Sequence, residues 1–226
     1  MKDTIYTNFL ITRPILDDME LDHNFPIVKK SNILNYQNSK IHLTNFKNIN
    51  SVIDKNQTII DMFNYDNILN LIWNDPLKYA YKFSQFLAIS TPDFSIYPKM
   101  SRMEIEHNIF KNRYIGSLYQ HIGINVIPTI SWGDSSTFDI CFKGVEKGSA
   151  VIISTLGVTS NYDIFINGFN EMKEQIEPEL IIVVGKLLPN MFGKFLVYKL
   201  NETFNPKLKN SQLSFFDLNN YIEIKK

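Results

Sequence analysis

The chain has 226 residues, 44% of them hydrophobic, which is enough for one sizeable core. Lys plus Arg and Asp plus Glu both total 23, so the chain lacks the global basic excess that nucleic-acid-binding proteins usually show. The single cysteine, Cys141, excludes an intrachain disulfide, and the N-terminus has no long apolar run, so a cytoplasmic protein without membrane contact is expected.

Residues 1–57 are polar and irregular, and they predict an N-terminal extension packed on the core rather than a domain. Short extended pieces are expected at 7–11 and 41–46, separated by turn-forming Asn and Ser. Residues 58–226 are predicted to form an α/β core domain.

From residue 58 onward, short apolar runs alternate with segments of helical periodicity. Strands are predicted at 58–63, 86–90, 126–130, 150–154, 180–184 and 195–200, with an edge strand at 221–224. Helices are predicted at 65–85 with a new start at 75–76, and at 101–122, 137–142 and 161–175. The helix at 101–122 has the clearest signal, because Ser101 and Glu104 match a capping box and Gly123 follows its end.

The predicted strands are short and apolar throughout, as in parallel sheets that are covered on both faces. Their order predicts an α/β fold with a mainly parallel sheet of five to six strands built from βα units. An incomplete TIM-like barrel and an open doubly wound sheet are both compatible with this order. In either architecture the carboxyl ends of the strands meet at one rim, where α/β proteins bind ligands.

Two aspartates follow neighbouring predicted strands at matching positions. Asp93 comes after the strand at 86–90, and Asp134 comes after the strand at 126–130. A pair of carboxylates at this rim could act as general acid and base or hold a divalent cation through oxygen ligands. Asp is also a frequent turn and helix-capping residue, so a purely structural role is the alternative for both.

Trp132 and Gly133 lie between these aspartates, at the end of a predicted strand. Trp132 could form the apolar wall of a ligand pocket, and Gly133 would allow close approach of a ligand to the backbone. Ordinary core filling by Trp132 is an equally good interpretation.

Anion contacts are predicted from two further segments. Arg102 lies in the first turn of its helix, where a cation opposes the helix dipole and therefore indicates a nearby anion, either Asp93 or a ligand. Ser154, Thr155 and Gly157 could supply hydroxyl and backbone N–H donors to the same anion. Arg113, in the middle of the same helix as Arg102, predicts a structural ion pair.

Several of these motifs together resemble a known family. They are the segments at 90–95 (STPDFS), 111–113 (KNR), 127–134 (IPTISWGD), 138–139 (FD), 154–157 (STLG) and 178–185 (PELIIVVG). In this combination the chain, over about residues 60–197, resembles the bacterial and phage proteins called domain of unknown function 4417. The resemblance implies occurrence on phages, prophages and plasmids and a cluster of polar motifs at one sheet rim, but no activity.

Two functional hypotheses follow. In the first, the rim binds a small polar or phosphorylated molecule, with Asp93 or Asp134 as base or metal ligand, and a metal-assisted hydrolase is one form of this hypothesis. In the second, the chain is a non-catalytic phage or plasmid protein that binds a host or replication macromolecule, such as a host-defence antagonist. Its contact surfaces would then be residues 1–57 and the region around 207–209.

Overall fold

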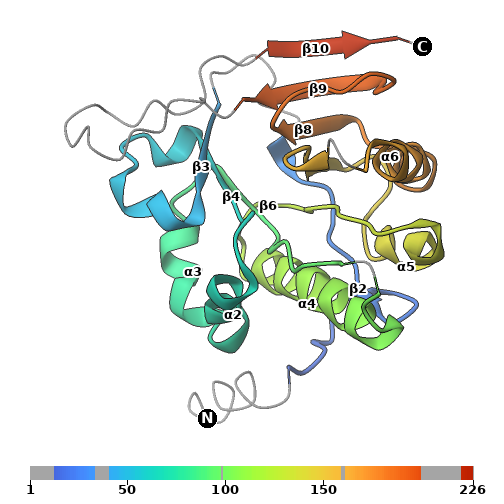
Figure 1. Cartoon of the computed structure of the whole chain (residues 1–226). Coiled ribbons are helices and arrows are strands. Elements are labelled where there is room, and N and C mark those ends of the chain that lie inside the picture. Colours follow the sequence, from blue (N-terminus) through green and yellow to red (C-terminus); the bar gives the residue numbers. More distant parts are fainter. Residues whose placement is uncertain (1–12, 34–40, 98, 159–160, 200–219, 226) are drawn as a thin grey trace.

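The computed structural model describes residues 13–33, 41–97, 99–158, 161–199 and 220–225 (Figure 1). The extended piece predicted at 7–11 and the contact region predicted at 207–209 lie outside these residues. The piece predicted at 41–46 is confirmed as strand β3 (His42–Asn45), which pairs in parallel with the first strand of the predicted core.

Two four-stranded sheets form the centre of the protein. The first is fully parallel, in the order β3, β4 (Thr58–Asp61), β5 (Ala88–Ser90) and β6 (Val126–Ile127). The second contains three parallel strands, β7 (Ala150–Ser154), β8 (Leu180–Val184) and β9 (Gly193–Tyr198), and β10 (Asn220–Ile224) pairs antiparallel with β9. A parallel bridge between Thr129 and Ile152 connects the two sheets.

Helices follow the strands, as the periodicity predicts (Figure 1). The first sheet carries α2 (Asp66–Asn74), α3 (Leu77–Phe83) and α4 (Arg102–His121), and the second is accompanied by α5 (Phe138–Cys141) and α6 (Tyr162–Ile176). Short 3-10 turns complete the chain at η2 (Phe46–Ser51), η3 (Lys55–Gln57) and η4 (Ser135–Thr137), and the short strands β1 (Leu21–Asp22) and β2 (Phe25–Pro26) form an N-terminal hairpin. The capping box of α4 is confirmed, since Glu104 N donates to Ser101 Oγ and Ser101 N donates to Glu104 Oε2.

The inner strands β4, β5 and β8 are buried on both faces. One face of the first sheet packs on α2, α3 and α4 through side chains such as Ile60 and Ile89, and one face of the second sheet packs on α6 through side chains such as Val183. The opposite faces of both sheets share a third cluster, to which every strand from β3 to β9 contributes. Tyr198 Oη at the end of β9 also donates to the carbonyl of Ile41, just before β3, over 3.1 Å.

The mixed α/β architecture with parallel strands is therefore confirmed. The finer prediction, a TIM-like barrel or a doubly wound sheet of five to six strands, is not confirmed, because the strands divide between two sheets of four. The predicted strand at 126–130 is also shorter than expected. It pairs with β5 only at Val126 and Ile127, and the chain then turns at Pro128 to reach β7 through Thr129.

A buried guanidinium joins the two halves of the molecule. Arg113 of α4 is only 2% exposed. Its Nε donates to the carbonyl of Lys143 over 2.8 Å, its Nη2 to that of Cys141 over 2.7 Å, and its Nη1 to that of Thr129 over 3.2 Å. The ion pair predicted for Arg113 is thus replaced by bonds to backbone carbonyls, which connect α4 with the segment after β6 and with the end of α5.

We expect Arg113→Met to lower the free energy of unfolding by roughly 3 kcal/mol or more, because three carbonyl oxygens would lose a buried donor. Arg102→Met on the same helix is the matched control. Arg102 is partly exposed and makes surface ion pairs, so its loss should cost less than about 1 kcal/mol. Urea unfolding followed by circular dichroism measures both values, and equal losses would contradict the role given to Arg113.

Candidate functional site

A polar cluster lies at the carboxyl ends of β4, β5 and β6, where α4 crosses them. Thr91, directly after β5, is its centre: the Thr91 hydroxyl donates to Asn112 Oδ1 over 2.8 Å and accepts from Thr129 N over 2.8 Å. The Thr129 hydroxyl donates to the carbonyl of Thr91 over 2.6 Å, and Asn112 Nδ2 donates to that of Pro92 over 2.8 Å. These bonds fix the segment at 91–96 against α4 and so position Asp93.

One carboxyl oxygen of Asp93 is unsatisfied within the described part of the chain. Its Oδ1 is buried and has no hydrogen-bond partner among the described residues. Burial raises the pKa of Asp93 to about 6, against the opposing effects of the Ser131 side chain and the charge of Arg113, while the charge of Asp66 raises it further. A second buried polar atom without a described partner, Nδ2 of Asn64, follows the neighbouring strand β4.

Asp66 and Lys111 are two further ionisable groups near this cluster. Asp66 Oδ1 accepts from the backbone N and the hydroxyl of Ser95 over 3.1 and 2.9 Å. The Lys111 side chain is 7% exposed and places its Nζ 3.7 Å from the centre of the Phe94 ring. Burial lowers the pKa of Lys111, and the charge of Asp66 opposes this effect.

A small cavity borders the same segment. Its volume is about 10 Å³, close to the space that one water molecule requires. Polar side chains from α4 and from the end of β6 contribute to its lining, among them Asn108, Asn112, Thr129 and Ser131. The cluster is therefore closely packed, with room for about one water molecule among the side chains that line this cavity.

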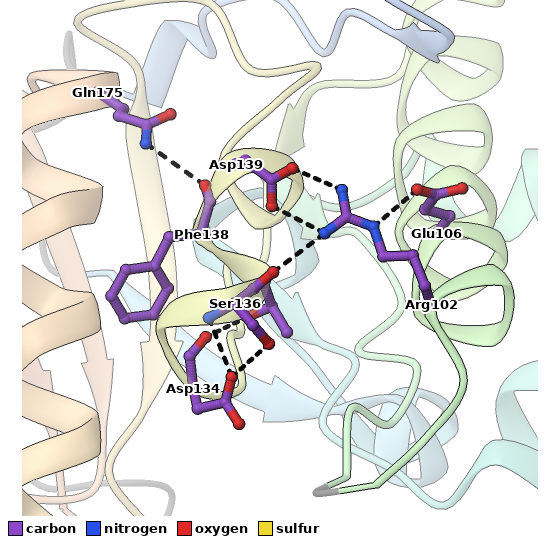
Figure 2. A network of polar contacts seen from close by, with 8 residues as sticks. Arg102, Glu106, Asp134, Ser136, Phe138, Asp139 and Gln175 are labelled. Atoms are coloured by element: carbon purple, nitrogen blue, oxygen red, sulfur yellow. Dashed lines mark hydrogen bonds and ion pairs between the residues drawn. The ribbon is translucent and has the colours of Figure 1, made fainter.

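Asp134 and Arg102, by contrast, lie at the surface, where each binds neighbouring residues of the chain (Figure 2). Asp134 is exposed and caps η4, accepting from Ser136 N over 3.0 Å and from Ser136 Oγ over 2.6 Å, and these bonds lower its pKa. Arg102 binds Asp139 of α5 through two nitrogens, over 2.6 and 2.8 Å, and Glu106 over 2.8 Å. The anion near Arg102 is thus Asp139 rather than Asp93.

Trp132 and Gly133 lie in the apolar packing around α6. The Trp132 ring centre is 5.1 Å from that of Phe165 and 6.0 Å from that of Phe142. A Cβ added to Gly168 of α6 would collide with the indole, so helix and ring are in direct contact. Gly133 N donates to Thr137 Oγ1 over 3.2 Å, which fastens the turn ahead of η4.

The loop after β7 is tied to the loop after β8. The Thr155 hydroxyl donates to the carbonyl of Lys186 over 2.8 Å and accepts from Lys186 N over 3.0 Å. Ser154 Oγ accepts from Leu156 N over 3.2 Å, and Gly157 has a positive φ of 75°, with open space where a Cβ would stand. Thr155 thus connects two loops, and Ser154 bonds within its own loop. That these residues donate hydrogen bonds to an anion stays a prediction.

Sequence analysis missed Asp61, the last residue of β4. Asp61 is 3% exposed, and its Oδ1 accepts from Asn45 Nδ2 over 2.8 Å and from Phe63 N over 3.3 Å. Burial raises the pKa of Asp61 to about 7, although both hydrogen bonds oppose the shift. The signal in the sequence was a lone aspartate inside the apolar run at 58–63.

Comparison with known proteins now adds to this geometry. The family model described as domain of unknown function (DUF4417) matches residues 18–202, more than half of the chain. The chain belongs to this family. The match begins well before residue 60, so the DUF4417 region includes β3 and much of the predicted N-terminal extension, a correction to the narrower range expected above.

Two phage proteins are similar to this DUF4417 chain. Gene 1 protein of Mycobacterium phage L5 is 33% identical over 136 residues, 59% of either chain. Gene 1 protein of Mycobacterium phage D29 is 33% identical over 119 residues, 51% of this chain and 44% of the relative. The chain thus spans about half the length of these curated relatives, and the expected phage association is confirmed. No solved structure matches the chain.

The described residues hold neither a cluster of metal-ligating side chains nor a helix that could span a membrane. No three His, Cys, Asp or Glu side chains in the described part of the chain are placed to share a metal ion. None of the helices described is both long and apolar enough to cross a bilayer.

We expect Asp61→Asn to flatten the dependence of stability on pH. The folded-state pKa of about 7 lies above the unfolded value of about 3.9, so the folded state keeps a proton that the unfolded chain releases. The stability contributed by this group is therefore complete below pH 4 and is lost as the pH rises through 7. The asparagine carbonyl can still accept from Asn45 and Phe63, so at pH 8 the variant should be more stable by on the order of 1–3 kcal/mol.

Urea unfolding at half-unit steps from pH 4.5 to pH 8 measures this effect. Asp134→Asn serves as control, because Asp134 is exposed and its pKa is lowered, which gives it no loss of stability in this range. Parallel curves for wild type and Asp61→Asn would contradict the buried, proton-binding state of Asp61.

Proposed function

We propose that this DUF4417 protein binds a small polar molecule at the carboxyl ends of β4, β5 and β6, with Asp93 as its principal contact. The observation that supports the proposal is the buried Oδ1 of Asp93, which lacks a partner among the described residues. An unsatisfied buried polar atom costs about 1–3 kcal/mol, so a fold that retains one has a reason to do so. A ligand that donates a hydrogen bond would recover this free energy.

The pKa of Asp93 gives the site a chemical capability. A carboxyl group with a pKa of about 6 exchanges its proton close to neutral pH, as a general base or acid must. The carboxylate whose charge acts on Asp93 is that of Asp66, across the rim on α2, and not that of Asp134. If this site supports a reaction, we therefore propose Asp93 with Asp66 as the pair of carboxylates.

The contacts of the other predicted site residues favour a ligand centred on Asp93. Arg102 would have to leave Asp139 and Glu106 to reach a phosphate, and Thr155 would have to release Lys186. Each exchange trades existing hydrogen bonds for new ones. A phosphorylated ligand consequently has less support than an uncharged or zwitterionic one.

Asp93→Asn is expected to remove most of the ligand binding, because the neutral amide is a weaker acceptor than a carboxylate and places an NH2 donor where one carboxyl oxygen stood. In a thermal-shift screen of nucleosides, sugars, sugar phosphates and amino acids at pH 7.5, a compound that raises the wild-type melting temperature should leave the variant unchanged. At a concentration of 100 Kd a ligand stabilises by about 2.7 kcal/mol, well within detection.

Asp134→Asn is the matched control, since it removes a carboxylate that only caps η4. It should respond to the same compound as the wild type does. A compound that stabilises Asp93→Asn but not Asp134→Asn would instead support a site on the other side of the rim.

A second candidate function, binding of a host or phage macromolecule, is favoured by exposed apolar side chains near β3. Ile53 and Tyr81 are 82% and 81% exposed, on segments that are joined where Lys82 Nζ donates to Asn50 Oδ1 over 2.8 Å. Replacing both with Ser should abolish a complex with a phage-encoded protein that Asp93→Asn leaves intact.

A further inference from the structure

Three lysine side chains around the segment after β3 have no acidic partner. The ion pairs found among the described residues all lie elsewhere, and none includes Lys47 of η2, Lys55 of η3 or Lys82 of α3. Asp54 is exposed and precedes Lys55 in the sequence, yet no lysine of the described residues lies within ion-pair distance of it. The described part of the chain therefore leaves these three positive charges unpaired.

Packing between η2 and α3 holds two of these lysines on one surface. The segment after β3 lies beside α3 (Figure 1), and Phe46 of η2 packs edge-on against Tyr79 and Phe83 of α3, with ring centres 5.5 and 5.9 Å apart. Lys82 Nζ donates to Asn50 Oδ1 over 2.8 Å, which joins the same two elements. Because the acceptor is a neutral amide, this bond positions the ammonium group and leaves its charge available.

Exposed tyrosine rings lie among the lysines. Lys47 Nζ is 5.3 Å from the centre of the Tyr65 ring. Lys55 Nζ donates to Gln85 Oε1 over 2.7 Å, and Gln85 Nε2 donates to the carbonyl of Tyr81 over 3.4 Å. Tyr65 and Tyr81 are 77% and 81% exposed. We call this set the lysine–tyrosine surface, and it consists of Lys47, Lys55, Tyr65, Tyr81 and Lys82.

Unpaired positive charge beside exposed aromatic rings matches the chemistry of a single-stranded nucleic acid. Ammonium groups attract phosphates whatever the base sequence, and aromatic rings stack on bases. The bases of a duplex are already stacked on each other, so exposed rings favour a single strand. The zero net charge of the whole chain does not oppose such binding, because a local cluster of charge is sufficient to attract a phosphate backbone.

We propose that the lysine–tyrosine surface binds single-stranded nucleic acid, with the lysines at phosphates and the tyrosines against bases. The proposal rests on the second candidate function, binding of a macromolecule, and is independent of the site at Asp93. The unpaired lysines favour a nucleic acid as this macromolecule, and a protein partner is the other outcome of the test. DNA and RNA share the chemistry that this surface recognises, so both are used as probes.

Fluorescence anisotropy of the full chain with labelled oligo-dT and oligo-U strands of about 20 nucleotides tests the proposal. The wild type should bind at least one strand, and the tighter of the two identifies the sugar that the surface prefers. Between about 50 and 200 mM salt the affinity should fall about 20-fold, because three phosphate contacts on a single strand release about two counterions. A dissociation constant that does not change with salt would contradict the lysine–phosphate contacts.

Two variants test the surface itself. Lys82→Gln should weaken binding and reduce its dependence on salt, and Tyr81→Ser should weaken binding by about fivefold or more, as the loss of one stacked base predicts. Lys147→Gln is the matched control, because it removes an exposed lysine that already pairs with Glu177 over 2.6 Å. Equal losses in Lys82→Gln and Lys147→Gln would show attraction without a defined surface and would overturn the proposal.

Ile53→Ser distinguishes a nucleic acid from a protein as the partner. An isoleucine side chain cannot stack on a base as an aromatic ring does, so this variant should bind oligonucleotides as the wild type does. If neither strand binds the wild type at about 50 mM salt, the nucleic-acid proposal is wrong. A protein complex that is lost when Ile53 and Tyr81 are both replaced would then still support the second candidate function.

Discussion

The guanidinium of Arg113 is the interaction on which the rest of the structure depends. It lies where α4, the segment after β6 and the end of α5 converge, and each of these supplies it with an acceptor. Backbone carbonyls that are buried at such a junction need a hydrogen-bond donor from the protein. Arg113 offers several donors in one plane, which a lysine could not do. The same side chain also orients Asn112, which in turn holds the loop of Asp93.

This arrangement separates the polar residues at the strand ends into two kinds. Most of them are consumed by the chain itself: Asp134 caps a turn, Thr155 ties two loops, and Arg102 pairs with α5. Others have a buried polar atom without a hydrogen-bond partner among the described residues, as Asp93 and Asn64 do. Residues of the first kind hold the loops of the rim together, and residues of the second kind are the ones to which a ligand could add a hydrogen bond. Position at a strand end does not distinguish between them.

Much of the fold could be predicted from local signals. The period of the apolar residues predicted α4 and α6, the capping box predicted where α4 begins, and the apolar runs predicted β7 and β8. The prediction was less complete where tertiary contacts decide the outcome. β3 has only one fully apolar residue, Leu43, and owes its strand to pairing with β4. Arg102 pairs with Asp139, whereas Asp93 and Asp134 do not come together. The spacing of these residues along the chain carries no information about their distance in the fold.

The hydrogen bond from Tyr198 to Ile41 has a consequence for how the protein is made. It joins residues 157 positions apart, and the apolar cluster around it takes side chains from every strand between them. During synthesis on a ribosome, β3, β4 and β5 can pack on their helices before β8 and β9 have been made. The opposite face of their sheet is not yet fully covered at that stage. That face stays open to water until residue 198 has left the exit tunnel, which makes the last parallel strand the step that closes the core.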